Sequence, residues 1–219
     1  MISGVFGLPG SGKSLFLGMI AQRAVSGKSI NFKTLSLGTL KRYKYVYTNF
    51  SCKGCYKLDY EKLGISNYTD CLILVDEIML LSDSRDYKKF TDSLKFFYSE
   101  HRKSNCDFLY ASQSYDDVDR KIRTRTQRLY YIDNWFFDFA RVRQIDYYFD
   151  VSGGRINEGY TYASPFTNFY FWKPSYYSNI DTKEIINGGF VEEPKLIPWE
   201  EDNKTLGAGQ GGKPPLCGG

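Results

Sequence analysis

The stretch GLPGSGKS (residues 7–14) lies between a short apolar run, ISGVF (2–6), and a segment with helical spacing, SLFLGMIAQRAV (14–25). In a GxxxxGKS loop the glycines allow a tight turn, so the backbone N–H groups face inward and hold a phosphate at the start of a helix. Lys13 is expected to reach the β- and γ-phosphates of ATP, and the Ser14 hydroxyl to bind Mg²⁺. The residues assigned to nucleotide binding are Gly7, Leu8, Pro9, Gly10, Ser11, Gly12, Lys13, Ser14 and Leu15. The order strand, glycine loop, helix therefore predicts a nucleotide site.

The rest of the chain alternates runs of strand length with a helical segment. The runs typical of strands are KYVYTNF (44–50), CLILVDE (71–77), CDFLYASQ (106–113) and RLYYI (128–132). Residues 88–101 have helical spacing, with one face formed by Phe90, Leu94, Phe97 and His101. Repeated units of this kind predict an α/β fold, a P-loop NTPase three-layer sandwich with a mostly parallel sheet covered on both faces.

Aromatic side chains, 17% of the sequence, concentrate after this core. Residues 135–154 and 160–177 alternate in character and predict antiparallel strands, either a β-hairpin at the edge of the sheet or a small lobe. We favour packing of these rings on the sheet. One alternative is a platform on which unpaired bases stack beside Arg141 and Arg143. Another is a contact between subunits.

The end of the sequence differs in composition from the rest. Residues 191–219 are polar and rich in Gly and Pro, which is typical of a disordered tail. The expected organisation is a P-loop core (1–134), an aromatic-rich β extension packed on that core (135–190) and a flexible tail (191–219).

The composition of the chain does not identify a binding partner, but it constrains the cellular compartment. A net charge of +4 permits a polyanionic partner without demanding one. Five cysteines, an odd number, argue against a secreted disulfide framework, and Cys52 and Cys55 form a lone CxxC that we interpret as loop thiols rather than metal or redox ligands. The sequence has neither the order of a signal peptide nor about 18 uninterrupted apolar residues, so a soluble, cytosolic chain is expected.

Polar side chains at two strand ends indicate hydrolysis. Asp76 ends an apolar strand, where its carboxylate is expected to hold the water shell of Mg²⁺ together with Ser14. Glu77 directly after it is suited to polarise the attacking water; the plainer interpretation is a carboxylate at a helix start that faces solvent. Gln113 ends the next strand at the edge where open parallel sheets bind ligands, and is expected to sense the γ-phosphate unless it is an ordinary strand-ending residue.

Two groups of basic residues are candidates for a finger that reaches a neighbouring subunit. His101 and Arg102 follow a predicted helix, where the helix dipole alone favours cations. The sharper interpretation places Arg102 in the nucleotide site of the next subunit of a ring. RKIRTRTQR (120–128), in which Arg123 alternates with Arg125 as on an exposed edge, is the second candidate and can also contact nucleic acid phosphates.

These motifs, in this order, resemble the ATPase domain of the zonula occludens toxin family. Its members are filamentous-phage assembly proteins, a branch of the FtsK and HerA superfamily of DNA-pumping ATPases. The resemblance covers roughly residues 1–185 and rests on an early GxPGSGK loop, a strand ending in DE, an HR before a strand ending in SQ, and DDVDRKIR. YTNF and YYSNIDTKEII are similar to that family's TN and YDT elements.

The resemblance implies an ATP- and Mg²⁺-dependent ring on the cytosolic side of the bacterial inner membrane that drives extrusion of single-stranded phage DNA. Phage assembly or coat proteins would be its partners. The implied roles are Mg²⁺ binding by Ser14 and Asp76, water activation by Glu77, sensing by Gln113, and a trans finger from Arg102 or Arg123; Lys13 and the loop glycines hold the phosphates.

One departure from the family leaves alternatives open. The family's usual transmembrane helix is missing, so either the chain reaches the membrane through a partner or it is a soluble genome-packaging ATPase of the same superfamily. A small P-loop nucleoside or nucleotide kinase usually carries an arginine-rich lid and a DR motif instead of a strand ending in DE. A third class, a nucleotide-dependent interaction module, would leave Glu77 idle.

Overall fold

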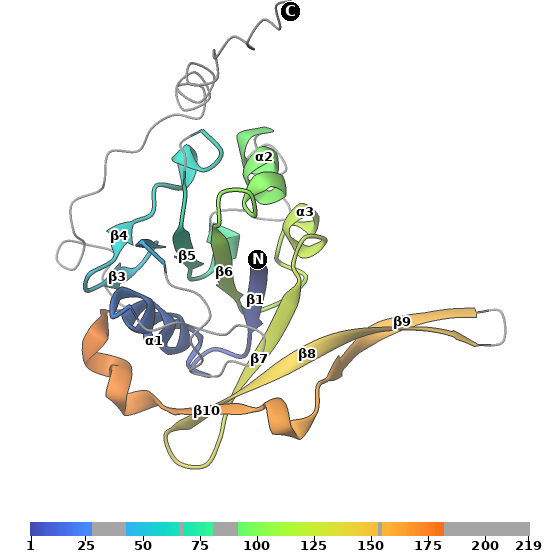
Figure 1. The fold of residues 1–219 in the computed structure, drawn as a ribbon. Coiled ribbons are helices and arrows are strands. Elements are labelled where there is room, and N and C mark those ends of the chain that lie inside the picture. Colours follow the sequence, from blue (N-terminus) through green and yellow to red (C-terminus); the bar gives the residue numbers. More distant parts are fainter. Residues whose placement is uncertain (28–42, 66–67, 81–91, 153–154, 182–219) are drawn as a thin grey trace, which may run out of the picture.

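The computed structural model describes residues 1–27, 43–65, 68–80, 92–152 and 155–181. Its centre is a nine-stranded sheet in the order β10-β8-β7-β1-β6-β5-β2-β4, with β9 paired to β8 (Figure 1). The strands are β1 (Ile2–Phe6), β2 (Tyr45–Thr48), β4 (Tyr56–Lys57), β5 (Cys71–Val75), β6 (Asp107–Ser112), β7 (Arg128–Asn134), β8 (Phe139–Ser152), β9 (Arg155–Tyr162) and β10 (Phe169–Trp172). The helices are α1 (Lys13–Val25), α2 (Asp92–Glu100) and α3 (Arg120–Arg123).

Six neighbouring strands, from β7 to β4, run parallel. The side chains of β1 and β5 are buried on both faces, which explains why these strands read as continuous apolar runs. One core cluster packs α1 on one face of the sheet, and a second packs α2 and α3 on the other. The predicted three-layer P-loop fold with a mostly parallel sheet is therefore confirmed.

The aromatic stretches form antiparallel strands of the same sheet, as predicted. β8 pairs with β7, β9 and β10, so it extends the sheet beyond the parallel part. β8 and β9 form a long hairpin that projects from the core (Figure 1). The chain then returns through β10 to a 3-10 helix, η5 (Lys173–Asn179), which packs beside α1. The predicted tail, 191–219, lies outside the described residues.

A short strand fixes the returning segment against the core. β11 (Ile180–Asp181) pairs antiparallel with β3 (Ser51–Cys52). The Ile180 side chain lies against α1 where a Cβ on Gly18 would come within 1.8 Å of it, so only glycine allows this approach. The described residues of the parallel part also form the one-turn helices η1 (Tyr60–Lys62) and η2 (Ile78–Leu80), and η4 (Pro165–Thr167) precedes β10.

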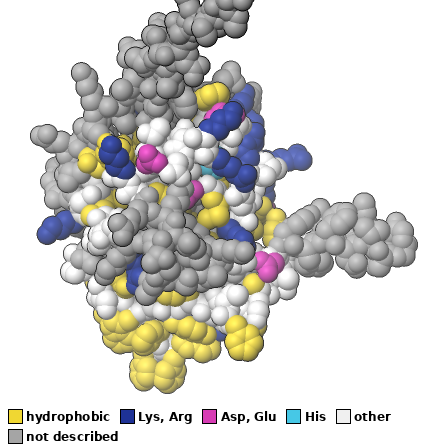
Figure 2. Space-filling view, viewed as in Figure 1, with side chains coloured by type: hydrophobic (Ala, Val, Ile, Leu, Met, Phe, Trp, Pro, Cys, Tyr) yellow, Lys and Arg dark blue, Asp and Glu magenta, His cyan; other side chains and the backbone are white. Residues whose placement is uncertain are grey.

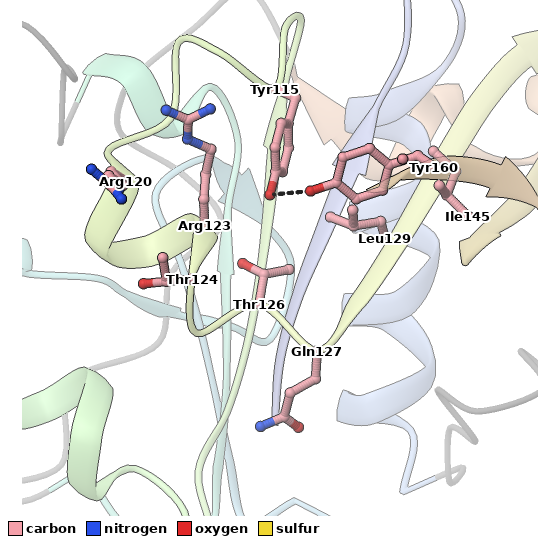
Figure 3. Close-up of a pocket in the computed structure, with 10 residues that line it drawn as sticks. Tyr115, Arg120, Arg123, Thr124, Thr126, Gln127, Leu129, Ile145 and Tyr160 are labelled. Atoms are coloured by element: carbon pink, nitrogen blue, oxygen red, sulfur yellow. Dashed lines mark hydrogen bonds between the residues drawn. The ribbon is translucent and has the colours of Figure 1, made fainter. Parts of the chain in front are cut away.

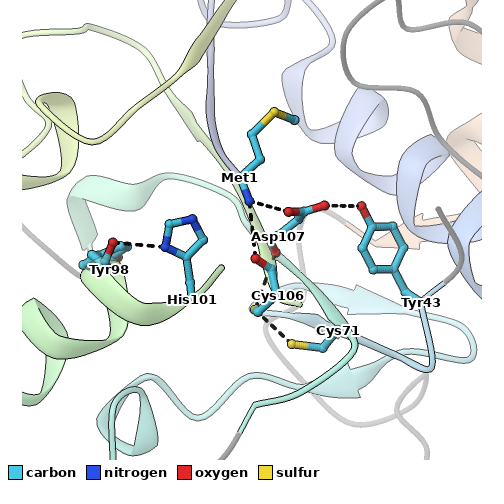
Figure 4. A network of polar contacts seen from close by, with 7 residues as sticks. All are labelled: Met1, Tyr43, Cys71, Tyr98, His101, Cys106 and Asp107. Carbon is cyan, nitrogen blue, oxygen red and sulfur yellow. Dashed lines mark hydrogen bonds and ion pairs between the residues drawn. The ribbon is translucent and has the colours of Figure 1, made fainter. Parts of the chain in front are cut away.

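A polar network lies at the amino ends of the parallel strands, the edge opposite the phosphate loop (Figure 4). The Asp107 carboxylate accepts from the Tyr43 hydroxyl at 2.6 Å and pairs with the terminal amine of Met1. The thiol of Cys71 lies 3.0 Å from that of Cys106. These contacts hold β5 and β6 at their starting ends.

Burial corrects the interpretation of His101 as a cation. His101 lies in the turn after α2 with 5% of its surface exposed. Its Nδ1 lies 3.0 Å from the Tyr98 carbonyl and donates to it, while Nε2 has no hydrogen-bond partner within the described residues. Burial, followed by the positive amino terminus, lowers the pKa of His101 to about 4, so it is neutral at pH 7. Arg102 remains an exposed cation in this turn.

The helix that precedes this turn is confirmed in part. α2 begins at Asp92, and Leu94 and Phe97 are buried on the sheet as predicted. Phe90 lies outside the described residues.

Candidate nucleotide site

The loop 7–12 joins β1 to α1 in a conformation that requires its glycines. Gly10 and Gly12 have φ values of +75° and +102°, in the left-handed region that L side chains rarely adopt. A Cβ on Gly7 would lie 2.3 Å from the Ile132 carbonyl oxygen of β7. Because Gly12 is the N-cap of α1, the free N–H groups of the first helical turn face the loop. The loop thus has the backbone that binds a phosphate.

Lys13 is held inside the loop by backbone carbonyls. Its ammonium donates to the carbonyl oxygens of Gly7 at 2.9 Å and Leu8 at 3.2 Å, and only 6% of the residue is exposed. Burial lowers the pKa of Lys13, and the nearby carboxylates of Glu77 and Asp76 oppose this shift. These carbonyl contacts are weaker partners for an ammonium than a phosphate, so a bound nucleotide would displace them.

Asp76 follows β5 and contacts the loop serine, Ser14. Its carboxylate accepts a hydrogen bond from the Ser14 hydroxyl, while burial raises the pKa of Asp76 against that bond. Asn49 at the end of β2 brackets the Asp76 backbone: its amide donates to the Asp76 carbonyl at 2.8 Å, and its Oδ1 accepts from the Asp76 N–H at 2.7 Å. Asn49 is a positioning residue that sequence reasoning did not place in the site, although the TN element contained the signal.

A buried oxygen of Asp76 without a hydrogen-bond partner indicates that the site suits Mg²⁺. Asp76 Oδ1 is buried without a hydrogen-bond partner in the described part of the chain, and it belongs to the carboxylate that contacts Ser14. A buried acceptor of this kind is costly unless a cation or its water shell satisfies it. A hydroxyl and a carboxylate are oxygen ligands that suit Mg²⁺. The residues fit this ion, which would neutralise charge on the nucleotide phosphates.

Glu77 faces the nucleotide pocket in a strained conformation. Its φ of +50° is unusual for a residue with a side chain. Glu77 Oε1 accepts from Gln113 Nε2 at 3.2 Å, and Oε2 is buried with no partner among the described residues. Both side chains line the same pocket as the phosphate loop, which has a volume of about 570 Å³. The structure therefore brings together the loop, Asp76, Glu77 and Gln113.

Comparison with known families agrees with this geometry. Residues 4–134 match the model of the ATPase family associated with various cellular activities (AAA). The chain belongs to the AAA family of ATPases. No curated protein sequence matches it.

Several solved structures are similar to this AAA ATPase. The N-terminal domain of zonular occludens toxin from Neisseria meningitidis has a TM-score of 0.44 and 18% identity, covering 65% of this chain and 82% of that one. The genome packaging NTPase B204 of Sulfolobus turreted icosahedral virus 2, in complex with ATP-gammaS, has a TM-score of 0.42 and 10% identity over 72% and 95%. The flagellar accessory protein FlaH of Methanocaldococcus jannaschii has a TM-score of 0.38 and 13% identity over 65% and 76%. The assignment as an ATPase rests on the family match.

The returning segment adds residues that sequence reasoning missed. Lys173, Tyr177 and Ile180 line the nucleotide pocket opposite the residues of the loop. Lys173 donates from Nζ to Asn134 Oδ1 at 3.0 Å, and its stem passes 3.3 Å from the position of a Cβ on Gly12. The pairing of β10 with β8 and of β11 with β3, both distant in sequence, brings these side chains to the AAA core.

The two finger candidates lie away from their own nucleotide pocket. Arg102 precedes β6, at the edge of the parallel sheet opposite the loop. Arg123 lies in α3, donates to Asp116 at 3.1 Å and has its guanidinium 5.2 Å from the centre of the Tyr115 ring. The expectation that Arg123 and Arg125 alternate along an exposed edge is wrong, because Asp119 caps a short helix over Arg120–Arg123.

The CxxC pair and the length of the helices concern two further expectations, the one about metal or redox ligands and the one about a transmembrane segment. Cys52 lies in β3 and Cys55 in the following turn, both buried against the α1 cluster, and their thiols share a hydrogen bond. The described residues contain no group of three or more His, Cys, Asp or Glu side chains that could hold a metal ion together. Among the helices that the structure describes, none has the length and apolarity needed to cross a membrane.

Proposed function

We propose that this AAA ATPase is the motor of a homo-oligomeric ring that hydrolyses ATP with Mg²⁺ and moves single-stranded phage DNA during virion assembly. The observation that carries the proposal is the Glu77 carboxylate, with one oxygen on Gln113 and the other unpaired, beside the phosphate loop. A carboxylate in this place suits hydrolysis, since a kinase would exclude water there. The motifs that resemble the zonula occludens toxin family support the choice of DNA as the polymer.

In the proposed reaction Glu77 takes a proton from the attacking water. The water oxygen bonds to the γ-phosphorus as the bond to the β–γ bridging oxygen breaks, which yields ADP and phosphate. Lys13 and the loop N–H groups would hold the β- and γ-phosphates. Ser14 and Asp76 would hold Mg²⁺, which would neutralise charge on those phosphates. Gln113 donates to Glu77 and would sense loss of the γ-phosphate through this contact.

The position of the arginines supports the proposed ring. Neither Arg102 nor Arg123 lines the nucleotide pocket of its own chain, so a finger from either would act on the next subunit. A guanidinium supplied in trans makes hydrolysis depend on assembly, typically by about 10³-fold or more.

The motor would work in the host bacterial cytoplasm or at the cytoplasmic face of the inner membrane, attached through a partner. Phage assembly or coat proteins are the expected partners. Extrusion of the DNA through the membrane and packaging of the DNA into a preformed shell use the same ATPase chemistry. The experiment below distinguishes the two.

The test measures phosphate release and oligomeric mass of the full chain with ATP and Mg²⁺, with and without single-stranded or duplex DNA. We expect a ring whose turnover rises with single-stranded DNA and which displaces streptavidin from a biotinylated strand; Lys13→Ala is the inactive control. Phosphoryl transfer to a nucleoside would instead identify a kinase, and binding without turnover an interaction module. Co-sedimentation with inner-membrane vesicles and phage proteins separates extrusion from packaging.

A further inference from the structure

The antiparallel part of the sheet carries an aromatic face that no other part of the described chain covers. In the register of β8, Phe139, Arg141, Arg143 and Ile145 point away from α1, while Ala140 and Val142 are buried under it. The rings on this outer face have 37% to 48% of their surface exposed, and we call them the aromatic face: Trp135, Phe139, Tyr160, Tyr162, Tyr170 and Trp172. Packing on the sheet, the favoured interpretation of the sequence, therefore does not account for them.

Exposed apolar side chains gather where β7 turns into β8 (Figure 2). The turn carries Phe136 and Phe137, which are 71% and 78% exposed. Trp135 and Phe139 flank them and connect this turn to the aromatic face. So large an exposed aromatic area marks a binding surface.

Two guanidiniums lie among the rings of the aromatic face. Arg143 lies 3.7 Å from the centre of the Tyr162 ring, and Arg141 lies 4.2 Å from that of Trp135. Both share the single carboxylate of Asp133, at 2.9 Å and 2.6 Å, so this trio has a net positive charge. Arg143 Nε is buried without a hydrogen-bond partner within the described residues. The face thus places a net positive charge, which attracts an anion, beside exposed rings.

A basic pocket continues the aromatic face toward α3 (Figure 3). It has a volume of about 860 Å³ and is lined by Tyr160 from the face and by Arg120 and Arg123 from α3. The Tyr160 hydroxyl donates to that of Tyr115 at 3.0 Å, and Arg123 Nε has no partner in the described structure. Two cationic side chains, Arg120 and Arg123, therefore lie at one end of a row of aromatic rings.

We infer that the aromatic face and this pocket form a binding track for single-stranded nucleic acid. Unpaired bases stack on the rings of Tyr160 and Tyr162 regardless of sequence. The guanidiniums of Arg143 and Arg123 bind the phosphates that link these bases. A duplex hides its base faces and cannot use the rings in this way. The charge complementarity between paired arginines and a phosphate backbone favours this occupant over a second copy of the chain, which is an outcome of the test below.

The track is joined to the nucleotide pocket by adjacent residues. Trp172 belongs to the aromatic face, and the next residue, Lys173, lines the nucleotide pocket and binds Asn134 at the end of β7. Phe171 before them packs on Phe16 of α1, with ring centres 5.9 Å apart. A polymer on the track and a nucleotide in the pocket would therefore contact consecutive residues, Trp172 at the end of β10 and Lys173 at the start of η5. The inference rests on the proposed function only for the choice of DNA as the polymer.

The test measures binding of a fluorescein-labelled oligothymidylate to the full chain by anisotropy over a series of salt concentrations. Tyr162→Ala is expected to weaken binding about 5- to 100-fold, whereas Tyr162→Trp restores it. Arg143→Gln is expected to reduce the slope of log K against log salt by about 0.7. Matched controls are Phe96→Ala on α2, 47% exposed, and Arg23→Gln on α1. Basal ATP hydrolysis and oligomeric mass should stay at wild-type values in all variants.

Cross-linking gives a direct measurement. An oligonucleotide with 4-thiothymidine should cross-link to peptides of β8 and β9. Unchanged affinity in both variants, or cross-links elsewhere, would overturn the track. Loss of oligomeric mass in Tyr162→Ala would instead assign the face to a contact between copies of the chain. If DNA stimulates hydrolysis equally in wild type and variants, the track fails while the motor stands; if the track binds DNA without stimulation, the motor fails and the track stands.

Discussion

Gln113 donates a hydrogen bond from Nε2 to Oε1 of Glu77 over 3.2 Å, across the ends of two neighbouring strands. The bond orients the carboxylate while its other oxygen, Oε2, has no partner in the described part of the chain. The backbone of Glu77 has a φ of +50°, a conformation that costs about 1–3 kcal/mol of free energy in a residue with a side chain. The folded chain keeps this conformation, which directs the carboxylate into the pocket. Strain of this kind is typical of residues that act in a reaction.

Glu77→Gln should keep ATP binding and lose hydrolysis, because the amide fills the same space without accepting a proton. General base catalysis contributes about 10²- to 10⁴-fold, so kcat should fall by that factor while the Kd for ATP changes little. Phosphate release and fluorescent-nucleotide binding measure the two quantities. Glu100→Gln, at the end of α2, is the control. Equal losses of ATP affinity and turnover would show that Glu77 is not the general base of the reaction.

Asn49→Leu should weaken the site through the backbone of Asp76. The substitution removes both hydrogen bonds that bracket Asp76 and leaves its N–H and carbonyl unpaired, at a cost of about 1–3 kcal/mol each where buried. We expect a lower melting temperature and a higher Mg²⁺ requirement for turnover. Asn49→Asp, which keeps the acceptor and loses the donor, should give a smaller change. A normal Mg²⁺ requirement in Asn49→Leu would show that Asn49 acts on stability alone.

Lys173→Ala should raise the KM for ATP and leave the fold intact. The ammonium lies in the nucleotide pocket on the surface of the returning segment, where it contacts Asn134 and is free to reach an anionic ligand. Loss of one charge-assisted hydrogen bond to phosphate corresponds to about 1.5–3 kcal/mol, or roughly 10- to 150-fold in affinity. Lys173→Arg should restore most of it. An unchanged KM would confine Lys173 to the contact with Asn134.

Arg102→Ala tests the finger across subunits. We expect turnover to fall about 10³-fold in assembled rings, with ATP affinity kept. Mixing Arg102→Ala chains with Lys13→Ala chains should recover activity in part, because each lacks a different half of a shared site. Arg123→Ala is the parallel variant, and whichever arginine shows this complementation is the finger. Normal turnover by a monomer that nevertheless loses activity on mutation would exclude a trans role.

Local patterns were enough to predict the parallel fold and the phosphate loop. The phosphate loop depends on its own backbone and immediate neighbours. β5, which the carboxylates of Asp76 and Glu77 follow, has the continuous apolar pattern of a buried strand. Gln113 was found because the carboxyl ends of parallel strands share one edge. These assignments needed no knowledge of distant contacts.

Distant contacts explain what the sequence did not predict. Lys173 and Tyr177 reach the pocket because β10 and β11 return to the core, and no periodic pattern encodes that return. α3 was missed because a helix of Arg120–Arg123 is too short to show helical spacing, although its cap, Asp119, was visible in the sequence. His101 has the spacing of a helix-end cation, and only its burial shows that it is neutral.

The burial of His101 makes stability depend on acid pH. Its pKa is about 4 in the folded chain and 6.5 when unfolded, so the unfolded state binds the proton more tightly. The free energy of unfolding is therefore unaffected by His101 above pH 6.5. It falls by about 3 kcal/mol in all as the pH drops from 6.5 to 4, because the unfolded state takes up the proton first. His101→Gln should flatten this part of the stability profile, measured by urea unfolding at each pH. A variant with the same slope as wild type between these values would assign the acid sensitivity to carboxylates instead.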